Sequence, residues 1–540
     1  MRTFTVQKNI LTEVFMDHPE WTLIKAKATP GRMLLDLKRS GKHKARAVKQ
    51  GFKEDKASAD GPDFNYYSHV AKLQTVRLAL LRPRRKNRRL AVKDVSTAFL
   101  QSDRYPEGVV KYMCIKDPVS LTWRYFEQSG PIYGEASAPI RWELTIAPWL
   151  VEQGFTRGQN EKCVFYHKER DLLVVLYVDD LLADGSLEDV DWIFDLLDIR
   201  FQCKPADYLT TATPLDYLGM EVSMTSDALY ICMAGYIDNC IDILGLKSTP
   251  GARHYHTPIA DAIDVDSAPL TPGARHYFLK CLGMAGWLAN TVRLDISYAV
   301  SRISQHAATP NESALCAVKR VFYYLDNTRQ LGLSVLLHQD RNAPEVLRLS
   351  QQTDGDVEGT NGLWEFWVDS DYAGNSESQN KRRAQNGSVF TIDRTPVTWS
   401  CKVTSVCFAH ADIGESHADM SSAAAEVYSA GNAAMDLMHL SYVVDEMGMD
   451  FPKPVFLQMD NDAAKVFAND TAFKTTLRHI DVRQHWVQVL RNKSILIPVW
   501  IAGLLNLADF FTKILARANY EPSRDQMMTE VPKTDSPSAT

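Results

Sequence analysis

Residues 172–182 read LLVVLYVDDLL, an apolar stretch in which two adjacent acids, Asp179 and Asp180, stand near the end. The run before the acids is long enough, and contains enough β-branched residues, to predict a buried strand. A second apolar pair follows directly, so we expect a hairpin with both carboxylates at its tip. Two carboxylates there repel each other and are poorly solvated from the strand side. A divalent cation removes that penalty, so the pair indicates either a metal site or an acidic turn between core strands.

The composition is typical of a folded, non-membrane protein. The chain has 540 residues, 45% of them apolar and 23% charged, which favours about two to four domains. A net charge of −6 provides no global basic field, so any nucleic-acid surface must be local. Nine cysteines without a CxxC pair predict reduced thiols rather than disulfides or a zinc site. No signal core or membrane-spanning run is present, so we expect a soluble intracellular protein, cytoplasmic or nuclear.

Two basic segments lie within the first hundred residues. Residues 38–53 contain seven lysines and arginines, among them Lys44 and Arg46, and residues 82–89 contain six. Such runs are usually solvated faces. Within reach of a metal-binding acid pair, contact with phosphates becomes the alternative.

A third acid lies upstream of the pair. Residues 91–100 read AVKDVSTAFL, with Asp94 at the end of a short strand-like piece. Template-directed phosphoryl transfer needs two metal ions about 3.5–4 Å apart. An Asp on one strand and an acid pair on a neighbouring hairpin would supply ligands for both ions.

Several motifs in order resemble the reverse transcriptase of Ty1/copia-type LTR retrotransposons. The resemblance continues into residues 277–332, and it implies an RNA-directed DNA polymerase shaped as a right hand, with fingers, palm and a reduced thumb. The motifs are KAR at 44–46, DVSTAFL at 94–100, YG at 133–134, YVDD at 177–180 and LGME at 218–221.

The resemblance implies roles for individual residues around the first acids. Asp94 and Asp179 would be direct metal ligands, and Asp180 would complete the triad. Phe99 would place its ring under the incoming sugar and exclude a ribose 2′-OH, although a core position is the alternative. Two residues of the fingers would contact phosphates. Arg46 would do so with a bidentate guanidinium fork, and Lys44 with a point charge.

One motif departs from the family pattern. The family usually reads Tyr-Gly-Leu-Lys-Gln-Ala-Pro, whereas residues 133–139 read YGEASAP. Ser137 therefore stands where a Gln would pack against the nucleotide, and Ala136 replaces a Lys. These changes indicate a divergent lineage or a decaying copy.

A second set of acids lies in the C-terminal part. Asp369 ends an alternating aromatic strand, Glu426 lies on a helix start, Asp460 follows a strand and Asp509 lies near a helix start. This order of acids resembles that of the RNase H domain that follows the reverse transcriptase in Ty1/copia-type retrotransposons. The resemblance implies that the four acids bind two Mg²⁺, with Mn²⁺ as a substitute, and hydrolyse the RNA strand of an RNA–DNA hybrid. Contacts to 2′-OH groups across the minor groove would select that strand.

Two neighbouring segments carry further polar residues. Residues 478–485 look like the family's basic His segment, so His485 would help proton transfer or product release, with a structural role as the alternative. The segment 402–420 is longer than usual in the family. It is expected to be a polar inserted loop, and a metal site within it is the less favoured alternative.

We therefore predict an α+β multidomain chain in which a right-hand polymerase precedes a helical connection and an RNase H-like α/β domain. An apolar stripe at helical spacing, including Val318 and Phe322, predicts core in the connection, with Gly332 ending the helical segment. The predicted parts are fingers and palm at 1–235, thumb and connection at 236–340, a linker at 341–362, RNase H at 363–515 and a disordered tail at 516–540.

The resemblance also implies partners and an alternative function. The partners are an RNA template, a DNA primer, the RNA–DNA hybrid and dNTPs. Protease, zinc-knuckle and integrase motifs are not found, so the chain resembles the C-terminal part of a copia-type polyprotein. The alternative is a catalytically decayed remnant that at most binds nucleic acid. An unrelated two-domain nuclease or phosphatase is disfavoured because it would not explain the order of motifs.

Overall fold

The computed structural model describes most of the chain, and its described residues group into two compact units. One unit contains residues 1–72, 87–207 and 446–448, and the other contains 73–86, 208–445 and 449–540. In the described part, no helix is both long and apolar enough to cross a bilayer. The described residues are 10–37, 43–54, 60–61, 63–82, 88–247, 254–337, 364–371, 384–403, 422–451, 453–469 and 485–532.

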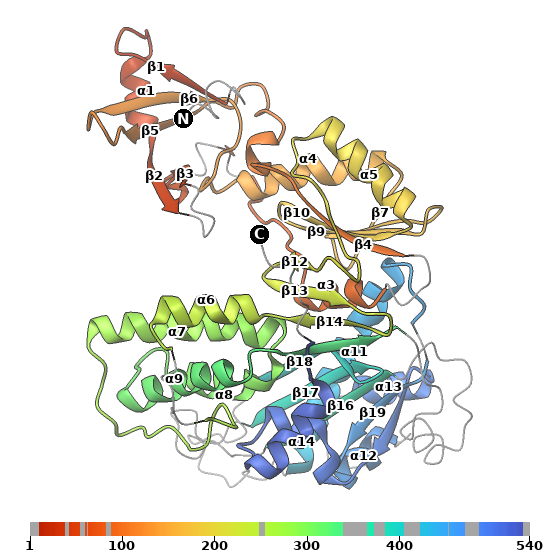
Figure 1. Cartoon of the computed structure of the whole chain (residues 1–540). Coiled ribbons are helices and arrows are strands. Elements are labelled where there is room, and N and C mark those ends of the chain that lie inside the picture. Colours follow the sequence, from red (N-terminus) through yellow and green to blue (C-terminus); the bar gives the residue numbers. More distant parts are fainter. Residues whose placement is uncertain are drawn as a thin grey trace. The chain divides into compact units, whose positions relative to one another are not determined.

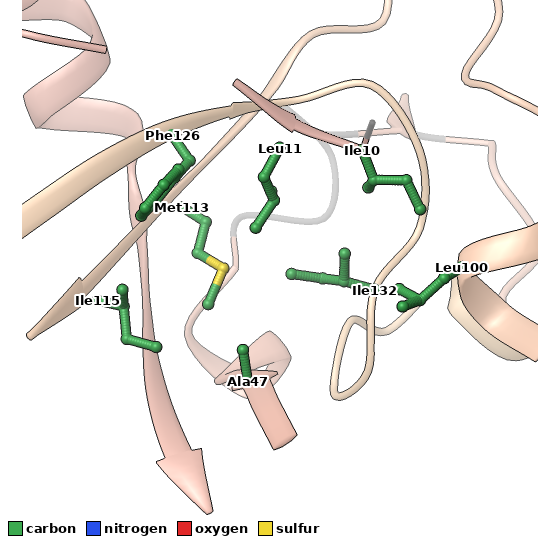
Figure 2. Close-up of a cluster of buried hydrophobic side chains, with 8 residues drawn as sticks. All are labelled: Ile10, Leu11, Ala47, Leu100, Met113, Ile115, Phe126 and Ile132. Carbon is green, nitrogen blue, oxygen red and sulfur yellow. The ribbon is translucent and has the colours of Figure 1, made fainter. Parts of the chain in front are cut away.

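The first unit begins with a five-stranded sheet in the order β1-β6-β5-β2-β3. Only β2 and β5 pair in parallel, and α1 (Trp21–Lys27) packs against β5 and β6. Apolar side chains from these strands form a compact core, which includes Met113, Ile115 and Phe126 (Figure 2). The strands are β1 (Leu11–Val14), β2 (Thr29–Leu37), β3 (His43–Lys49), β5 (Lys111–Lys116) and β6 (Trp123–Gln128).

A second sheet of the same unit has the order β11-β4-β10-β9-β8-β7. The predicted strand at 172–176 is confirmed as β9, and all its residues but the last are buried. Helices α4 (Ala138–Glu152) and α5 (Leu187–Arg200) lie on one side of this sheet (Figure 1). The strands are β4 (Arg89–Asp94), β7 (Thr156–Arg157), β8 (Val164–His167), β9 (Leu172–Tyr177), β10 (Asp180–Gly185) and β11 (Asp207–Tyr208), and short 3-10 helices occur at η2 (Gly51–Lys53) and η4 (Ala98–Gln101).

The second unit contains the predicted helical middle. The apolar stripe of α9 is buried at Val318 and Phe322, as expected. The prediction that Gly332 ends this helical segment is wrong, because α9 stops at Asn327 and Gly332 lies in β15. A Cβ at Gly332 would come within 2.2 Å of the Ile231 carbonyl oxygen, so the close pairing with β14 requires glycine. The helices are α3 (Leu73–Leu81), α6 (Ala234–Leu244), α7 (Pro272–Thr291), η5 (Leu294–Ile296), α8 (Ser297–Ser304) and α9 (Glu312–Asn327).

Two sheets complete the second unit. The order of one is β12-β13-β14-β15-β21, and that of the other is β18-β17-β16-β19-β20. In the latter, β16 pairs antiparallel with β17 and parallel with β19. The strands are β12 (Leu215–Tyr217), β13 (Met220–Met224), β14 (Ala228–Cys232), β15 (Leu331–Leu336), β16 (Trp364–Asp371), β17 (Gln385–Ile392), β18 (Thr395–Val403), β19 (Val455–Met459), β20 (Leu496–Trp500) and β21 (Thr529–Glu530).

The C-terminal segment differs from the prediction. A disordered tail from residue 516 is wrong over 517–532, which form α14 and β21. Tyr520 is buried, stacks on Phe510 with ring centroids 4.8 Å apart, and donates its hydroxyl to the Asp295 carbonyl at 2.8 Å. The prediction of disorder rested on the proline, serine and threonine content of this segment, and composition does not reveal a few buried anchoring residues. The remaining helices are α11 (Ser422–Glu446), α12 (Asp462–Asn469), α13 (Trp486–Asn492), η8 (Gly503–Leu505), η9 (Leu507–Phe511) and α14 (Arg517–Met527).

Sheets and helices in both units confirm the predicted mixed α and β multidomain class. The functional domain boundaries stay predictions, and the compact units divide the chain differently, with residues 208–235 in the second unit. The linker, most of the 402–420 insertion, the segment 478–484 and the end of the tail lie outside the described residues.

Candidate active sites

The first set of acids meets at one end of the second sheet. β4 ends at Asp94 and β10 begins at Asp180, and the antiparallel register places these two residues opposite each other. The register also pairs Asp180 with Tyr177, so Val178 and Asp179 form a two-residue turn between β9 and β10. The predicted hairpin with both carboxylates at its tip is confirmed.

The turn itself is strained and is held by two hydrogen bonds. Val178 adopts a φ of 58°, a left-handed conformation that a β-branched residue rarely takes. The indole of buried Trp142 in α4 donates to the Val178 carbonyl at 2.6 Å, and the Val95 amide donates to the Asp179 carbonyl at 2.8 Å. Sequence reasoning missed Trp142, because nothing local in the sequence connects the middle of α4 to this turn.

The charges around the turn favour a cation. Burial raises the pKa of Asp179, and the nearby charge of Asp94 raises it further, against the opposing charges of Lys204 and Arg46. Lys204 forms an ion pair with Asp94, and 57% of the lysine side chain is exposed. An arriving metal ion could therefore take the place of this lysine and offset the repulsion between the carboxylates.

Two predicted nucleotide contacts meet at a tyrosine beside these acids. The rings of Phe99 and Tyr133 lie with centroids 5.3 Å apart, and the Arg46 guanidinium lies 5.9 Å from the Tyr133 ring centroid. Burial raises the pKa of Tyr133, and the charge of Asp179 adds to this effect. Phe99 is only half-buried, so a pure core role does not describe it. The side chain of Lys44 lies outside the described part of the chain.

The side chain of Ser137 points into the protein. The side chain is fully buried, and its hydroxyl donates to the Glu135 carboxylate at 2.6 Å and accepts from Lys111 at 3.1 Å. These contacts do not favour the predicted contact between the Ser137 side chain and a nucleotide, which stays a prediction. The replacement of Gln by a short hydroxyl lets the side chain turn inward to a buried acid.

The second set of acids gathers at one edge of the sheet that contains β16. Asp369 lies near the end of β16 and Asp460 directly follows β19, and these parallel strands end at the same edge. Glu426 reaches the same place from α11. One carboxylate oxygen from each of the three acids lies within 4.8 Å of the other two, and the described residues contain no other such group of metal-ligating side chains.

The electrostatics of this cluster fit a bound cation. Burial, together with the charges of Asp369 and Asp460, raises the pKa of Glu426 to about 9. One oxygen of Glu426 accepts from the Ser370 amide at 3.2 Å, while Oε2 has no hydrogen-bond partner among the described residues. Burial and the charge of Asp369 also raise the pKa of Asp460. A divalent cation would satisfy the orphaned oxygen of Glu426 and lower the pKa values of Glu426 and Asp460.

The fourth acid lies beside a lysine. Burial and the charge of Asp369 raise the pKa of Asp509 to about 7. The Lys513 ammonium lies 2.9 Å from Asp509 and 3.8 Å from Asp369, and the Thr512 hydroxyl donates to Asp369. Sequence reasoning missed Thr512 and Lys513, although both follow Asp509 within one helical turn, where side chains at i and i+4 meet.

His485 makes contacts that suit a structural role. Its Nδ1 lies 2.9 Å from Gln488 Oε1, and its ring centroid lies 5.3 Å from that of Phe467. These contacts favour the structural alternative, and a part of His485 in proton transfer stays a prediction.

Comparisons with known proteins show similarity to reverse transcriptases and to the Pol polyproteins of transposons. Residues 24–260 match the family described as "Reverse transcriptase (RNA-dependent DNA polymerase)". The Pol polyprotein of transposon TNT 1-94 from Nicotiana tabacum is 24% identical over 527 residues, which cover 91% of this chain and 35% of the relative. The Pol polyprotein of transposon RE1 from Arabidopsis thaliana is 24% identical over 508 residues, covering 91% of this chain and 31% of the relative.

More distant similarity is found as well. The transposon Ty1-BL Gag-Pol polyprotein of Saccharomyces cerevisiae is 23% identical over 314 residues, or 56% of this chain and 17% of the relative. A solved foamy viral protease-reverse transcriptase in complex with double-stranded DNA has a TM-score of 0.46 at 10% identity, covering 92% of this chain and 68% of that one. The chain spans about a third of the length of the two plant polyproteins.

Proposed function

For a chain that is related to the Pol polyproteins of copia-type retrotransposons and contains a reverse transcriptase domain at residues 24–260, we propose a fused pair of activities. The N-terminal part, which contains Asp94, Asp179 and Asp180, is an RNA-directed DNA polymerase that extends a DNA primer on an RNA template with dNTPs. The second unit hydrolyses the RNA strand of the resulting RNA–DNA hybrid. Both reactions are phosphoryl transfers at sites built from carboxylates.

The register between β4 and β10 supports the polymerase most directly. It brings Asp94 opposite Asp180, beside the turn that holds Asp179. These acids would hold Mg²⁺, which supplies Lewis-acid activation of the primer 3′-hydroxyl and of the leaving group. Arg46 would bind the triphosphate, and Phe99 with Tyr133 would line the place of the incoming sugar.

The clustering of Asp369, Glu426 and Asp460 within 4.8 Å supports the nuclease. With Asp509, these acids would hold two Mg²⁺ and orient the scissile phosphodiester. Lys513 sets the ionisation of Asp509 and offers a cation to the phosphate backbone.

A decayed remnant that only binds nucleic acid is the second candidate. The departure from the family pattern at residues 133–139 favours it. The assembly of both acid sets, each at one end of a sheet, favours the active enzyme, because each set places carboxylates where they can hold metal ions.

Primer extension tests the polymerase. We expect the full chain to extend a DNA primer on RNA with Mg²⁺, and Asp179→Asn to lose at least about 100-fold in rate, since metal-assisted charge stabilisation is worth several kcal/mol. Asp195→Asn, which changes an exposed acid on α5, is the matched control and should behave as wild type. If folded wild-type protein extends no primer in Mg²⁺ or Mn²⁺, the active polymerase is refuted and the decayed remnant is the function that is kept.

Hydrolysis of a labelled RNA–DNA hybrid tests the nuclease separately. We expect Asp460→Asn to lose cleavage while it retains primer extension, because the two acid sets lie in different units. Asp445→Asn, at an exposed position of α11, serves as control. Cleavage that survives Asp460→Asn would refute the assignment of this cluster.

A further inference from the structure

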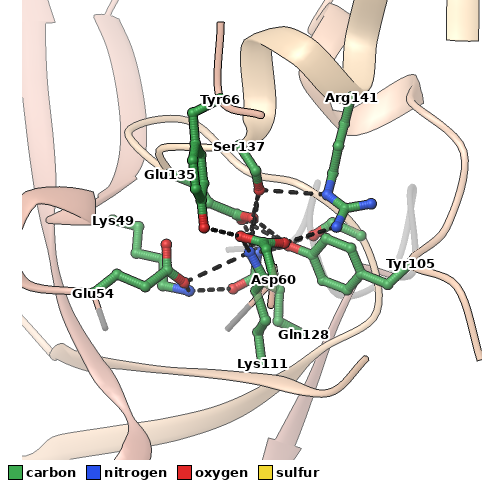
Figure 3. Close-up of polar contacts among 11 residues, drawn as sticks. Lys49, Glu54, Asp60, Tyr66, Tyr105, Lys111, Gln128, Glu135, Ser137 and Arg141 are labelled. Carbon is green, nitrogen blue, oxygen red and sulfur yellow. Dashed lines mark hydrogen bonds and ion pairs between the residues drawn. The ribbon is translucent and has the colours of Figure 1, made fainter. Parts of the chain in front are cut away.

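A buried ionic cluster lies where three strands of the first sheet approach the start of α4 (Figure 3). Cationic and anionic side chains alternate in it, and all three of its carboxylates are at most 4% exposed. Such a cluster is costly to bury unless every charge is paired and hydrogen-bonded. Its members are Lys49, Glu54, Asp60, Tyr66, Tyr105, Lys111, Gln128, Glu135, Ser137 and Arg141.

Glu135 is the most connected member of this cluster. Its Oε1 accepts from Lys111 at 2.7 Å and from Ser137 at 2.6 Å, and its Oε2 accepts from Tyr105 at 2.7 Å. Burial raises the pKa of Glu135, but the charges of Lys111 and Lys49 outweigh burial and hold that pKa below its ordinary value. The buried carboxylate is therefore ionised and fully paired.

Lys111 connects Glu135 to the rest of the cluster. Its ammonium also lies 2.7 Å from Asp60, which in turn accepts from Arg141 of α4 at 2.7 Å. The cluster therefore joins β5, the first turns of α4 and the segment at Asp60 through charged hydrogen bonds. Because the partners lie on separate elements, the cluster restrains all of them relative to Glu135.

The loop that contains Glu135 also presents Tyr133 beside the polymerase acids. The Lys49 amide donates to the Tyr133 carbonyl at 2.8 Å, and the Gly51 amide donates to the Gly134 carbonyl at 3.0 Å. Gly134 has a φ of +80°, and a Cβ there would come within 2.2 Å of the Lys49 carbonyl oxygen. The loop backbone is thus fixed against the end of β3, two residues from the buried carboxylate.

We propose that Glu135 is a positioning residue of the polymerase site, which fixes through the buried ionic cluster the loop that presents Tyr133 to the incoming nucleotide. The proposal rests on the polymerase function proposed above. The family pattern has Leu-Lys-Gln at the three positions that Glu135, Ala136 and Ser137 occupy here. In this chain, nucleotide binding depends on a buried charge network, to which Ser137 contributes its hydroxyl, instead of on direct contacts from long side chains at residues 136 and 137.

The cluster predicts that a single substitution disturbs the loop and that a second substitution partly restores it. Glu135→Leu leaves Lys111 buried beside an apolar group, which disturbs the loop. Adding Lys111→Met removes the buried cation that has lost its Glu135 partner and leaves Asp60 paired with Arg141, so the double variant should recover part of the loss. Glu135→Gln keeps the shape but loses the charge and should lie between Glu135→Leu and wild type.

The experiment uses the full chain with a poly(rA) template, an oligo(dT) primer and dTTP. We expect Glu135→Leu to raise the KM for dTTP about ten- to hundredfold, with a smaller change in kcat, because a displaced contact residue weakens nucleotide positioning. Cleavage of an RNA–DNA hybrid should be unchanged, which reports that the protein is folded. Glu152→Gln, an exposed glutamate of α4, is the matched control.

Hydrogen–deuterium exchange of peptides covering residues 129–137 gives a readout that needs no activity. Glu135→Leu should exchange faster there than wild type, and Glu135→Leu/Lys111→Met should exchange more slowly than the single variant. Wild-type protein without any extension would contradict the polymerase function, whereas the exchange pattern would still report on the loop. An active wild type, together with a Glu135→Leu variant of unchanged KM and unchanged exchange, overturns the positioning role.

Discussion

Replacing Glu426 by Gln should stabilise the metal-free second unit at neutral pH. The carboxyl is buried between Asp369 and Asp460, which raises its pKa from 4.5 to about 9. A raised folded-state pKa means that the stability of the fold is complete below the ordinary carboxyl pKa and falls as pH rises toward 9. At pH 7 the unfolded carboxyl is ionised and the folded one is still protonated, which costs about 3 kcal/mol. Gln has no such cost.

Amide hydrogen exchange of peptides from α11 and β16 measures this effect in the full chain. In EDTA, wild-type protection should fall between pH 5 and pH 8, while Glu426→Gln should stay protected, with a difference of about 3 kcal/mol at pH 7. Mg²⁺ should then protect the wild type and leave Glu426→Gln nearly unchanged, because the variant lacks a ligand.

Two results would refute this reasoning. One is a Glu426→Gln variant that is less protected than wild type in EDTA at pH 7, which would mean that the carboxylate is stabilised by contacts other than a cation. The other is the same pH dependence in both proteins, which would place the titrating group elsewhere. Asp445→Asn, on the exposed side of the same helix, controls for the loss of one negative charge.

Three further predictions address other contacts. Trp142→Phe removes the hydrogen bond to the Val178 carbonyl, so primer extension should slow about tenfold, in line with a lost bond of roughly 1–2 kcal/mol, while hybrid cleavage should be unchanged. Tyr520→Ala should destabilise the second unit by about 3–5 kcal/mol and speed limited proteolysis; a variant as resistant as wild type would contradict the docking of α14. Lys513→Met removes the cation that lowers the pKa of Asp509, so the acidic limb of the pH–rate profile for RNA hydrolysis should move to higher pH, and Lys513→Arg should restore it.

The local pattern of the chain was sufficient to find both sets of acids. The apolar run before Asp179 predicted β9 and its hairpin, and the alternating aromatics before Asp369 predicted β16. These predictions succeeded because a buried strand needs a continuous or alternating apolar run, and this need is visible within a few residues. Composition failed for 517–532, where a few buried anchors such as Tyr520 outweigh the polar majority.

The sequence by itself therefore determined which strands end in carboxylates and the order in which they follow one another. Only the tertiary structure decided which side chains surround those carboxylates. Trp142 reaches the strained turn from α4, Lys204 pairs with Asp94, and Lys111 of β5 donates to the Ser137 hydroxyl. Each of these contacts joins elements whose approach depends on packing and burial across the whole unit, and burial is also what turns ordinary carboxyls into groups with shifted pKa values.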